Sequence, residues 1–560
     1  MYSMQDSNTN IEYDKGSKLV DWRLRNLNYD RIIDVHKASD HPEVNSFVNE
    51  IFDQYLGLND APTRTRNAYK KNLKVLLLDL YVAWCNDPAQ YIKVHMSENV
   101  YGTGAYRIKR YNDLWIKVTL PRVIRILRAV GMTPEEENQC KLNGGHYETG
   151  VIGFKRGFDI GEGRISRVWA TNKLITMFEN ARFGEFDIGY SKGRATVILK
   201  DNDKNFIDYK STRETDRMSE LVRDYNALLE KSFIDIGDLE IPRIKVGDRK
   251  TKKKDDEGNL IYEPVFVNIT HQGKFTRRIF NNSSFKKGGR WYGGWWQRLN
   301  SKLREDILID GERTIEIDFS GLHPNLAYTR QGLDYDGDDP YNIYIEAFEE
   351  LGINHTDASR EVIKLMMLLG LNATDEEILF KAFRDNFNYS FLGAFDFSFT
   401  NKQLSKILQS IKDHHSPIAD QFATGAGIDL MYMDSQIVEE IINLFTVQEE
   451  PILTVHDSFI VKFWQKDLLL ACMKEAFQSI TDRSKVKLKQ THHILTREQV
   501  TASKHLDRDY YLDYINDAVP ETPKTCRGYL NRLNRHNKHY ANKDVQQDRP
   551  MFVPDWTMVY

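Results

Sequence analysis

Residues 314–321 read Thr-Ile-Glu-Ile-Asp-Phe-Ser-Gly, and this stretch decides the fold of the half of the chain that carries the candidate chemistry. Apolar Ile315, Ile317 and Phe319 alternate with acidic Glu316 and Asp318. A period of two predicts a β-strand with one buried face and one acidic face. Because Ser-Gly ends the run, Asp318 is expected near the end of the strand, where a carboxylate can reach a metal ion.

A second stretch, residues 452–461, reads Ile-Leu-Thr-Val-His-Asp-Ser-Phe-Ile-Val. Two β-prone apolar runs flank a polar centre, which predicts a tight hairpin with Asp457 at its tip. An unpaired carboxylate is costly to bury, so Asp457 needs a cation, a hydrogen-bond network or water.

Together, Asp318 and Asp457 are able to hold two Mg²⁺ ions about 3.5–4 Å apart, with Mn²⁺ as a substitute. Mg²⁺ prefers oxygen ligands and retains water, so two carboxylates and the phosphates of a substrate suffice. The alternative reading is that these are two unrelated aspartates at strand ends.

A third stretch is helical and cationic. Arg360, Lys364, Leu368 and Asn372 follow one another at a spacing of four residues, which places them on one helix face. Two cations one turn apart can bind successive phosphates of a nucleoside triphosphate. The alternative is a core helix, marked by its Met and Leu residues, with two solvated cations.

In this order the three stretches resemble motifs A, B and C of family A DNA polymerases and of the related bacteriophage-type single-subunit RNA polymerases. Asp318-Phe319-Ser320 resembles motif A, Arg360-x-x-x-Lys364 resembles the start of motif B, and Val455-His456-Asp457 resembles motif C. Upstream, Gly289-Arg290 with Gln297 looks like the element that contacts the strands near the active site. The resemblance covers about residues 275–465.

The resemblance implies a template-directed nucleotidyltransferase, a DNA polymerase or primase-polymerase of a phage or mobile element. Asp318 and Asp457 would bind the metal ions, and Arg360 and Lys364 the incoming triphosphate. Lys364 is also a candidate to protonate the departing pyrophosphate. Arg290 and Gln297 would contact template or primer, and His456 would support the primer end.

Several residues depart from the family pattern. Ser458 follows Asp457 where the DNA polymerases usually have Glu, and His323 occupies the motif A position that excludes ribose, so the sugar of the bound nucleotide is open. Asn372-Ala373 replaces Tyr-Gly in motif B, and the resemblance implies that Asn372 and His323 would contact the nucleotide. Only about 80 residues separate motifs B and C, which predicts reduced fingers. Two alternatives stay open: a primase or RNA polymerase that starts strands without a primer, and a non-catalytic replication initiator or DNA-binding scaffold.

The N-terminal part shows the element order of a winged helix. A helix is predicted over residues 120–130, two strands over 147–154 and 164–169, and a second helix from Asn172. The wing would carry Arg164 and Arg167 beside a Gly-rich turn, which suits phosphate contact. The pattern is weakly similar to winged-helix replication initiators. The alternative is a solvated basic hairpin on an ordinary α+β domain.

The predicted fold class is α+β: a right-hand polymerase palm, built as an antiparallel sheet with helices, preceded by a helical and winged-helix region. The expected boundaries are 1–105 for a helical region, 106–230 for the winged-helix-like region, 231–500 for the palm and 501–560 for a basic helix and tail. Residues 232–287 predict β-hairpins, and the charged run at 249–258 predicts a solvated turn.

Composition is that of a globular protein. The chain has 560 residues, 41% hydrophobic and 28% charged, with a net charge of −4, so any contact with phosphates needs a local basic surface. The four cysteines form no C-x-x-C pair, which favours a reducing, cytoplasmic setting without structural zinc. No apolar run approaches the roughly 20 residues of a membrane span, so no membrane partner is expected. DNA, nucleoside triphosphates and a helicase or small accessory replication protein are the candidate partners.

Overall fold

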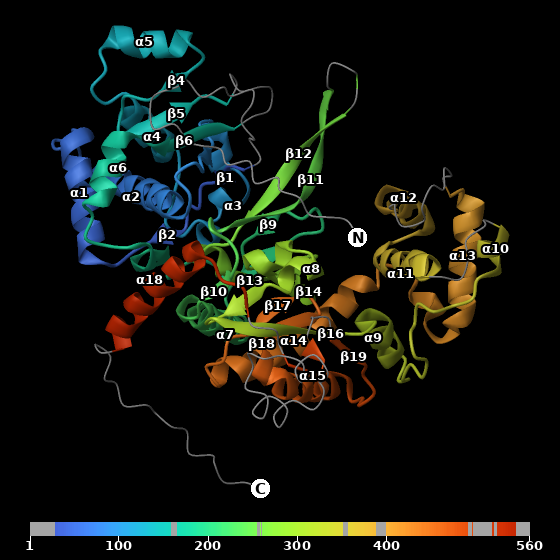
Figure 1. Ribbon diagram of the computed structural model, residues 1–560. Helices are drawn as coiled ribbons and strands as arrows, with labels where there is room; N and C mark the ends of the chain where they lie inside the picture. Colours follow the sequence, from blue (N-terminus) through green and yellow to red (C-terminus); the bar gives the residue numbers. More distant parts are fainter. Residues whose placement is uncertain are drawn as a thin grey trace.

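The computed structural model describes residues 29–157, 165–254, 258, 260–350, 357–387, 399–490, 495–496, 518–519 and 523–544. Helices and mostly antiparallel sheets are mixed along the chain (Figure 1), so the predicted α+β class is confirmed at this coarse level. None of the described helices is long and apolar enough to cross a membrane.

The N-terminal unit is built around a five-stranded sheet in the order β1-β3-β6-β5-β4. Its elements are β1 (Arg31–Ile32), β2 (Lys37–Ala38), α1 (Pro42–Tyr55), α2 (Thr63–Asn86), β3 (Ile92–Val94), η1 (Glu98–Gly102), α3 (Gly104–Arg107), η2 (Lys109–Tyr111), α4 (Thr119–Arg128), α5 (Pro134–Leu142), β4 (His146–Tyr147), β5 (Ile152–Lys155), β6 (Ser166–Ala170), α6 (Asn172–Glu179), η4 (Glu185–Asp187) and β7 (Gly189–Tyr190). One cluster of buried side chains runs through the unit from Ile33 to Ile188.

This unit differs from the predicted winged helix. The order α4, β5, β6, α6 is present, but β6 also pairs with β3, so the two strands lie inside a sheet and do not project as a wing. The physical reason is that all four residues of β5 are buried, as are four of the five of β6. The predicted boundary at residue 105 falls within the single core of this unit.

The central sheet has the strand order β10-β15-β16-β18-β17, and β19 pairs with the end of β16. The strands are β10 (Ile234–Ile236), β15 (Ile307–Ile309), β16 (Glu312–Phe319), β17 (Leu453–Val455), β18 (Ser458–Lys462) and β19 (Leu488–Gln490). Every pairing in this sheet is antiparallel. The two stretches that decide the candidate chemistry are therefore neighbouring strands, β16 and β18.

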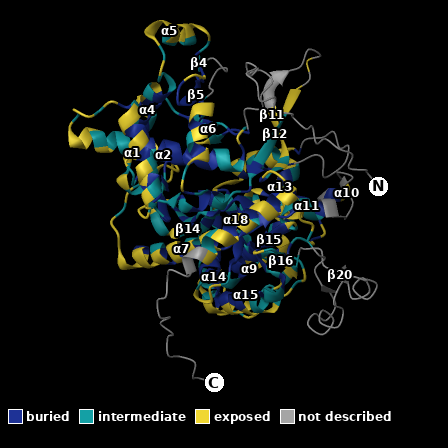
Figure 2. Ribbon diagram, turned by 60° about the vertical axis from the view of Figure 1, so that its left-hand side comes forward, coloured by how far each residue is buried: buried dark blue, intermediate teal, exposed yellow. Residues whose placement is uncertain are grey.

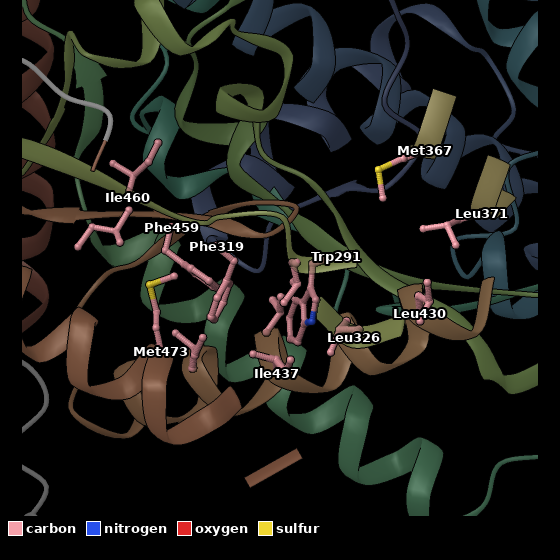
Figure 3. Close-up of a cluster of buried hydrophobic side chains, with 14 of the residues drawn as sticks. Trp291, Phe319, Leu326, Met367, Leu371, Leu430, Ile437, Phe459, Ile460 and Met473 are labelled. Atoms are coloured by element: carbon pink, nitrogen blue, oxygen red, sulfur yellow. The ribbon is translucent and has the colours of Figure 1, made fainter. Parts of the chain in front are cut away.

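Helices pack against the central sheet and build the larger core. After η9 (Phe463–Gln465), α15 (Lys466–Thr481) contacts both β16 and β18, and α14 (Gly427–Val447) packs on α15. Phe319 and Phe459 from the sheet meet Met473 of α15, with Ile437 of α14 beside them (Figure 3). Burial of such aromatic and aliphatic side chains is the main stabilising contribution.

A second sheet, in the order β14-β13-β8-β9, carries the Gly-Arg element. Its strands are β8 (Val197–Lys200), β9 (Phe206–Ile207), β13 (Thr276–Asn281) and β14 (Ser284–Gly293). Helix α14 covers β14, and α7 (Arg213–Lys231) packs on β8 and β13. Three short helices flank these strands in the sequence: η5 (His271–Lys274), η6 (Trp295–Arg298) and α8 (Ser301–Arg304).

The segment between β16 and α14 is helical and lies to one side of the sheets (Figure 1). Its elements are α9 (Leu322–Arg330), α10 (Glu346–Glu350), α11 (Asp357–Asn372), α12 (Glu376–Asn386), α13 (Asn401–His414) and η8 (Ser416–Gln421). The cationic stretch lies on α11, as its spacing predicts.

Three further features lie outside these units. A two-stranded ribbon, β11 (Arg243–Lys254) with β12 (Leu260–Asn268), projects from the body. The charged run predicted as a turn thus belongs in part to a strand, since β11 continues to Lys254. The other two are the small pair β20 (Leu495–Thr496) and β21 (Ala518–Val519), and the C-terminal basic helix α18 (Arg527–Asp544), which is present as predicted.

Candidate functional site

The antiparallel register brings the two predicted carboxylates together. Asp318 of β16 is paired with Ser458 of β18, the residue that follows Asp457 in the sequence. The backbone N–H of Phe319 donates to the carbonyl oxygen of Asp457 at 3.3 Å. Asp318 and Asp457, which are 139 positions apart in the sequence, therefore stand at one edge of the central sheet.

The turn that carries Asp457 has an unusual backbone. Only two residues, His456 and Asp457, join β17 to β18. His456 has φ of 59°, a left-handed conformation that a residue with a Cβ adopts at a cost. Strained backbone of this kind clusters at functional sites. The side chain of His456 is exposed, and its ring lies 6.1 Å from that of Tyr292.

Burial and neighbouring carboxylates make both aspartates harder to ionise. Burial raises the pKa of Asp318 to about 8, with further contributions from Asp457 and Glu316, while the charges of Lys364 and Lys489 oppose the rise. Burial also raises the pKa of Asp457, and the nearby carboxylate of Asp434 adds to it. Two partly buried carboxylates that share a site cannot both ionise readily without a cation.

A third acid on the same strand is neutralised. Glu316 is 1% exposed, and the guanidinium of Arg304 donates to its two oxygens at 2.6 and 2.9 Å. The hydroxyl of Ser458 donates to the same carboxylate at 2.5 Å. Of the two acids predicted on this face of the strand, Glu316 is thus occupied by Arg304 and Ser458. Asp318 is the one that can still bind a metal ion.

Beside Asp457 lies a buried network that joins Arg290, Asp434 and His323. Arg290 Nε donates to Asp434 at 2.6 Å, and one of its terminal nitrogens lies 2.7 Å from His323 Nε2. Arg290 lies close enough to Asp457 for its charge to lower the pKa of that carboxyl, in opposition to burial. The ion pair with Arg290 likewise holds the pKa of Asp434 below its usual range, against the effect of burial.

Asp434 was not predicted from the sequence. It is fully buried on α14, and within residues 427–447 it interrupts an otherwise apolar face. A buried acid in an apolar helix needs a partner, and that is the signal by which it could have been found.

Gln297 acts as a brace within the site. Its amide donates to the carbonyl of Thr454 at 2.9 Å and to that of Trp291 at 3.2 Å. The indole N–H of Trp296 donates to the same Thr454 carbonyl at 3.0 Å. The predicted contact of Gln297 with template or primer is therefore replaced, in this conformation, by support of the strand that leads to Asp457.

The three polar residues predicted to bind nucleotide on α11 lie in different surroundings. Lys364 is exposed and close enough to Asp318 for its charge to lower the pKa of that carboxyl. Arg360 donates to Asp339 at 2.5 Å and to Glu361 at 3.1 Å. Asn372, predicted to bind nucleotide, lies two turns further along and donates to the Leu368 carbonyl of its own helix at 2.7 Å, so it is not brought to the aspartates.

Tyr341 is a second residue that sequence reasoning missed. Burial raises the pKa of its phenol, and Asp457, Asp339 and Asp318 add to the rise. The guanidinium of Arg360 lies 5.3 Å from the centre of its ring. Tyr341 therefore lies between the aspartates and Arg360, and no motif in the sequence marks it.

Of the two arginines predicted on the wing, only Arg167 is among the described residues, and it lies on β6 of the N-terminal unit. Arg164 lies outside the described residues. Arg167 is 2% exposed and donates to Asp30 at 3.0 Å. The predicted contact of Arg167 with nucleic acid does not fit this placement, because β6 lies inside the sheet and its arginine neutralises a buried acid.

The donor set suits a hard divalent cation. Among the described residues, no group of three or more His, Cys, Asp or Glu side chains is arranged to hold a metal. Asp318 and Asp457 have raised pKa values, and no other side chain in the described part of the chain donates a hydrogen bond to their carboxylates. Two carboxylates that lack such donors fit an ion that completes its shell with water and substrate oxygens.

Neither a protein-family model nor a curated protein matches this chain. Among solved structures it is similar to the polymerase domain of Pol1 from M. smegmatis in complex with DNA primer-template and dNTP, with 11% identity and a TM-score of 0.26. The match covers 50% of this chain and 51% of that one, so this chain spans about half the length of the matched protein. A TM-score this low does not establish a common fold, and the site is interpreted from its own residues.

Proposed function

We propose that this protein is a template-directed nucleotidyltransferase whose central sheet serves as a polymerase palm of the family A type, in the replication of a phage or mobile element. The observation that carries the proposal is the pairing of β16 with β18, which sets Asp318 beside the turn that bears Asp457. A scaffold protein has no need for two partly buried carboxylates with raised pKa values at the end of a sheet.

Asp318 and Asp457 would hold two Mg²⁺ ions, or Mn²⁺ in their place. When bound, such ions lower the pKa of an attacking 3′-hydroxyl and neutralise the charge that develops on the triphosphate. The protein's own part is to hold both carboxylates in register and to supply positive charge beside them. The β16–β18 ladder sets the register, and the charges of Lys364 and Lys489 favour the ionised form of Asp318.

Lys364 and Arg360 would receive the triphosphate. Lys364 is exposed next to Asp318, where an ammonium can neutralise a phosphate and give a proton to the departing pyrophosphate. Arg360 is half-buried and held by Asp339, so it would exchange that carboxylate for a phosphate when nucleotide binds.

Arg290 and His456 would face the primer terminus. Arg290 is oriented by Asp434 and His323, and His456 is exposed on the turn immediately before Asp457. His323 sits in this network next to Arg290, so its ring would contribute to the choice between deoxyribose and ribose.

The test uses purified protein with Mg²⁺, labelled dNTPs or rNTPs, and either primed or unprimed single-stranded DNA. Product on the primed template alone supports a primer-dependent polymerase. Product without a primer supports the primase alternative. No product under any condition contradicts the proposal and leaves the scaffold reading.

The decisive variant is Asp457→Ala. Loss of one metal ligand is expected to abolish nucleotide incorporation, while affinity for primer-template stays that of the wild type. Asp467→Ala removes an exposed aspartate of α15 and serves as the matched control that extends normally. Normal extension by Asp457→Ala would contradict the assignment.

A further inference from the structure

The β11–β12 ribbon, residues 243–268, is an arm that joins neither of the two larger sheets. Its two strands pair only with each other among the described strands. Figures 1 and 2 show from two directions that it rises away from the body. Lys250 and Tyr262 are paired across it and exposed, and 58% of the Tyr262 surface is accessible. An isolated two-stranded hairpin is only marginally stable in water. The exposed half of the ribbon therefore contributes little to the stability of the fold.

Positive charge is concentrated on one strand of the ribbon. Seven of the twelve residues of β11 are Lys or Arg and one is Asp, whereas β12 has a single acid and no base. Three acidic residues follow at positions 255–257. In a chain with a net charge of −4, such a strand is a local site for phosphates.

The base of the ribbon is fixed to both halves of the molecule. Val267 is fully buried in the larger core. Arg243 donates to Asp87 of the N-terminal unit at 3.2 Å, and its guanidinium lies 4.4 Å from the ring of Tyr29. A rigid base allows the exposed half to hold a partner in a defined direction.

The ribbon is also connected to the catalytic turn. β12 contacts η6, the segment whose Trp296 and Gln297 donate to the Thr454 carbonyl. Thr454 lies on β17, two residues before His456. A partner held by the ribbon is therefore positioned relative to Asp457 through few intervening contacts.

We infer that the β11–β12 ribbon binds the phosphate backbone of the nucleic-acid duplex that the catalytic site extends. A two-stranded ribbon fits the major groove of a duplex. Twelve residues of strand extend about 40 Å, slightly more than one turn of a duplex, about 34 Å. Lys245, Arg249 and Lys250 are the exposed cations with described side chains. The inference deepens the proposed function and rests on it for the identity of the duplex.

The test measures binding of the full chain to a labelled primer-template by fluorescence anisotropy, over a range of salt concentrations and without nucleotide. Arg249→Glu combined with Lys250→Glu is expected to weaken binding at least about tenfold and to reduce the slope of log Kd against log salt by about 2. The control combines Lys231→Glu with Lys474→Glu, two exposed lysines of α7 and α15. It changes the net charge equally and should bind as the wild type does.

A milder double variant, Arg249→Ala with Lys250→Ala, tests whether the charge reversal acts by misfolding. It should also reduce the slope of log Kd against log salt, and its Tm should equal that of the wild type. Wild-type affinity and slope in both ribbon variants would overturn the inference. So would an equal loss for single-stranded DNA alone and for duplex, because the ribbon is assigned to duplex.

Incorporation at saturating primer-template separates this inference from the proposed function. Ribbon variants that bind weakly but extend at the wild-type rate once saturated support both. A wild type that binds duplex through the ribbon and never extends a primer contradicts the proposed function and leaves the ribbon assignment standing.

Discussion

Single residues set the geometry of the candidate site. Asp318 reaches the sheet edge because it is the last acid of β16 before Phe319 and Ser320, where the strand ends. Asp457 reaches the same edge because His456 turns the chain with a positive φ. Arg304 donates to both oxygens of Glu316, so this carboxylate does not bind a metal ion. The two metal-binding candidates are selected from a larger set of acids by such local contacts.

The backbone at His456 leads to a stability prediction. Glycine adopts φ of 59° without the clash of a Cβ, so His456→Gly is expected to raise the free energy of unfolding by about 1 kcal/mol. His456→Ala keeps the Cβ and should bring no such gain. Urea denaturation of both variants checks the prediction, and equal stabilities of the Gly and Ala variants would contradict it.

The raised pKa of Asp318 predicts a pH effect. The carboxyl has a pKa of about 8 in the folded chain and of about 4 when unfolded, so the folded state binds the extra proton between these values. Stability of the metal-free protein should fall as pH rises from about 4 to 8. Asp318→Asn removes this loss: its Tm in a chelating buffer should exceed that of the wild type at pH 8 and match it near pH 4. A pH-independent difference in Tm would contradict this cause.

At the scale of elements, α18 uses its basic residues inside the protein. Arg532 is 8% exposed and donates to Asp235 of β10 at 2.7 Å. Tyr529 packs against Phe233 and Leu308. Arg535 reaches Glu185 of the N-terminal unit at 3.0 Å. The basic helix α18 thus joins the two units through ion pairs.

This packing predicts unequal effects of two arginine substitutions. Arg532→Ala leaves Asp235, 2% exposed, without its cation, and should lower the free energy of unfolding by about 3–5 kcal/mol. Arg535→Ala leaves Glu185 buried, but its arginine is half exposed, so the loss should be smaller, about 1–3 kcal/mol. Guanidinium denaturation of both variants tests the difference, and similar losses would contradict it.

Two parts of the N-terminal unit differ from what the sequence pattern predicts. Helix α5 was not predicted, although Thr133 and Glu136 form a capping box at its start, with hydrogen bonds of 3.2 and 2.7 Å. The strand predicted over 164–169 is β6, but the single strand predicted over 147–154 is the antiparallel pair of β4 and β5, and these strands lie inside a sheet. Sequence periodicity reports which residues are buried and cannot report which strand covers them.

At the scale of the whole molecule, there are two large hydrophobic cores. One extends from Ile33 to Ile188 and the other from Leu221 to Phe477. Ion pairs such as Arg243 with Asp87 join them, as do aromatic contacts such as Tyr29 with Phe266. Units with separate cores unfold separately more readily than units that share a core.

Calorimetry is therefore expected to resolve two unfolding transitions. Ile124→Ala and Ile437→Ala each empty a fully buried site, one in each core, at a cost of about 2–5 kcal/mol. Ile124→Ala should lower one transition and Ile437→Ala the other. A shift of one common transition by both variants would contradict the separation.

The sequence by itself determined the α+β class, the strand of Asp318, the hairpin of Asp457 and the helix of Lys364, because alternation and helical spacing are local properties. Tertiary structure alone decided that Asp434 and Tyr341 belong beside the aspartates, that Arg167 is buried, that Gln297 is a brace and that β11 is one strand of an arm. The reason is physical: burial and partnership depend on residues far apart in the chain, such as Arg290 and Asp434, whose encounter is fixed only when the sheets and α14 pack.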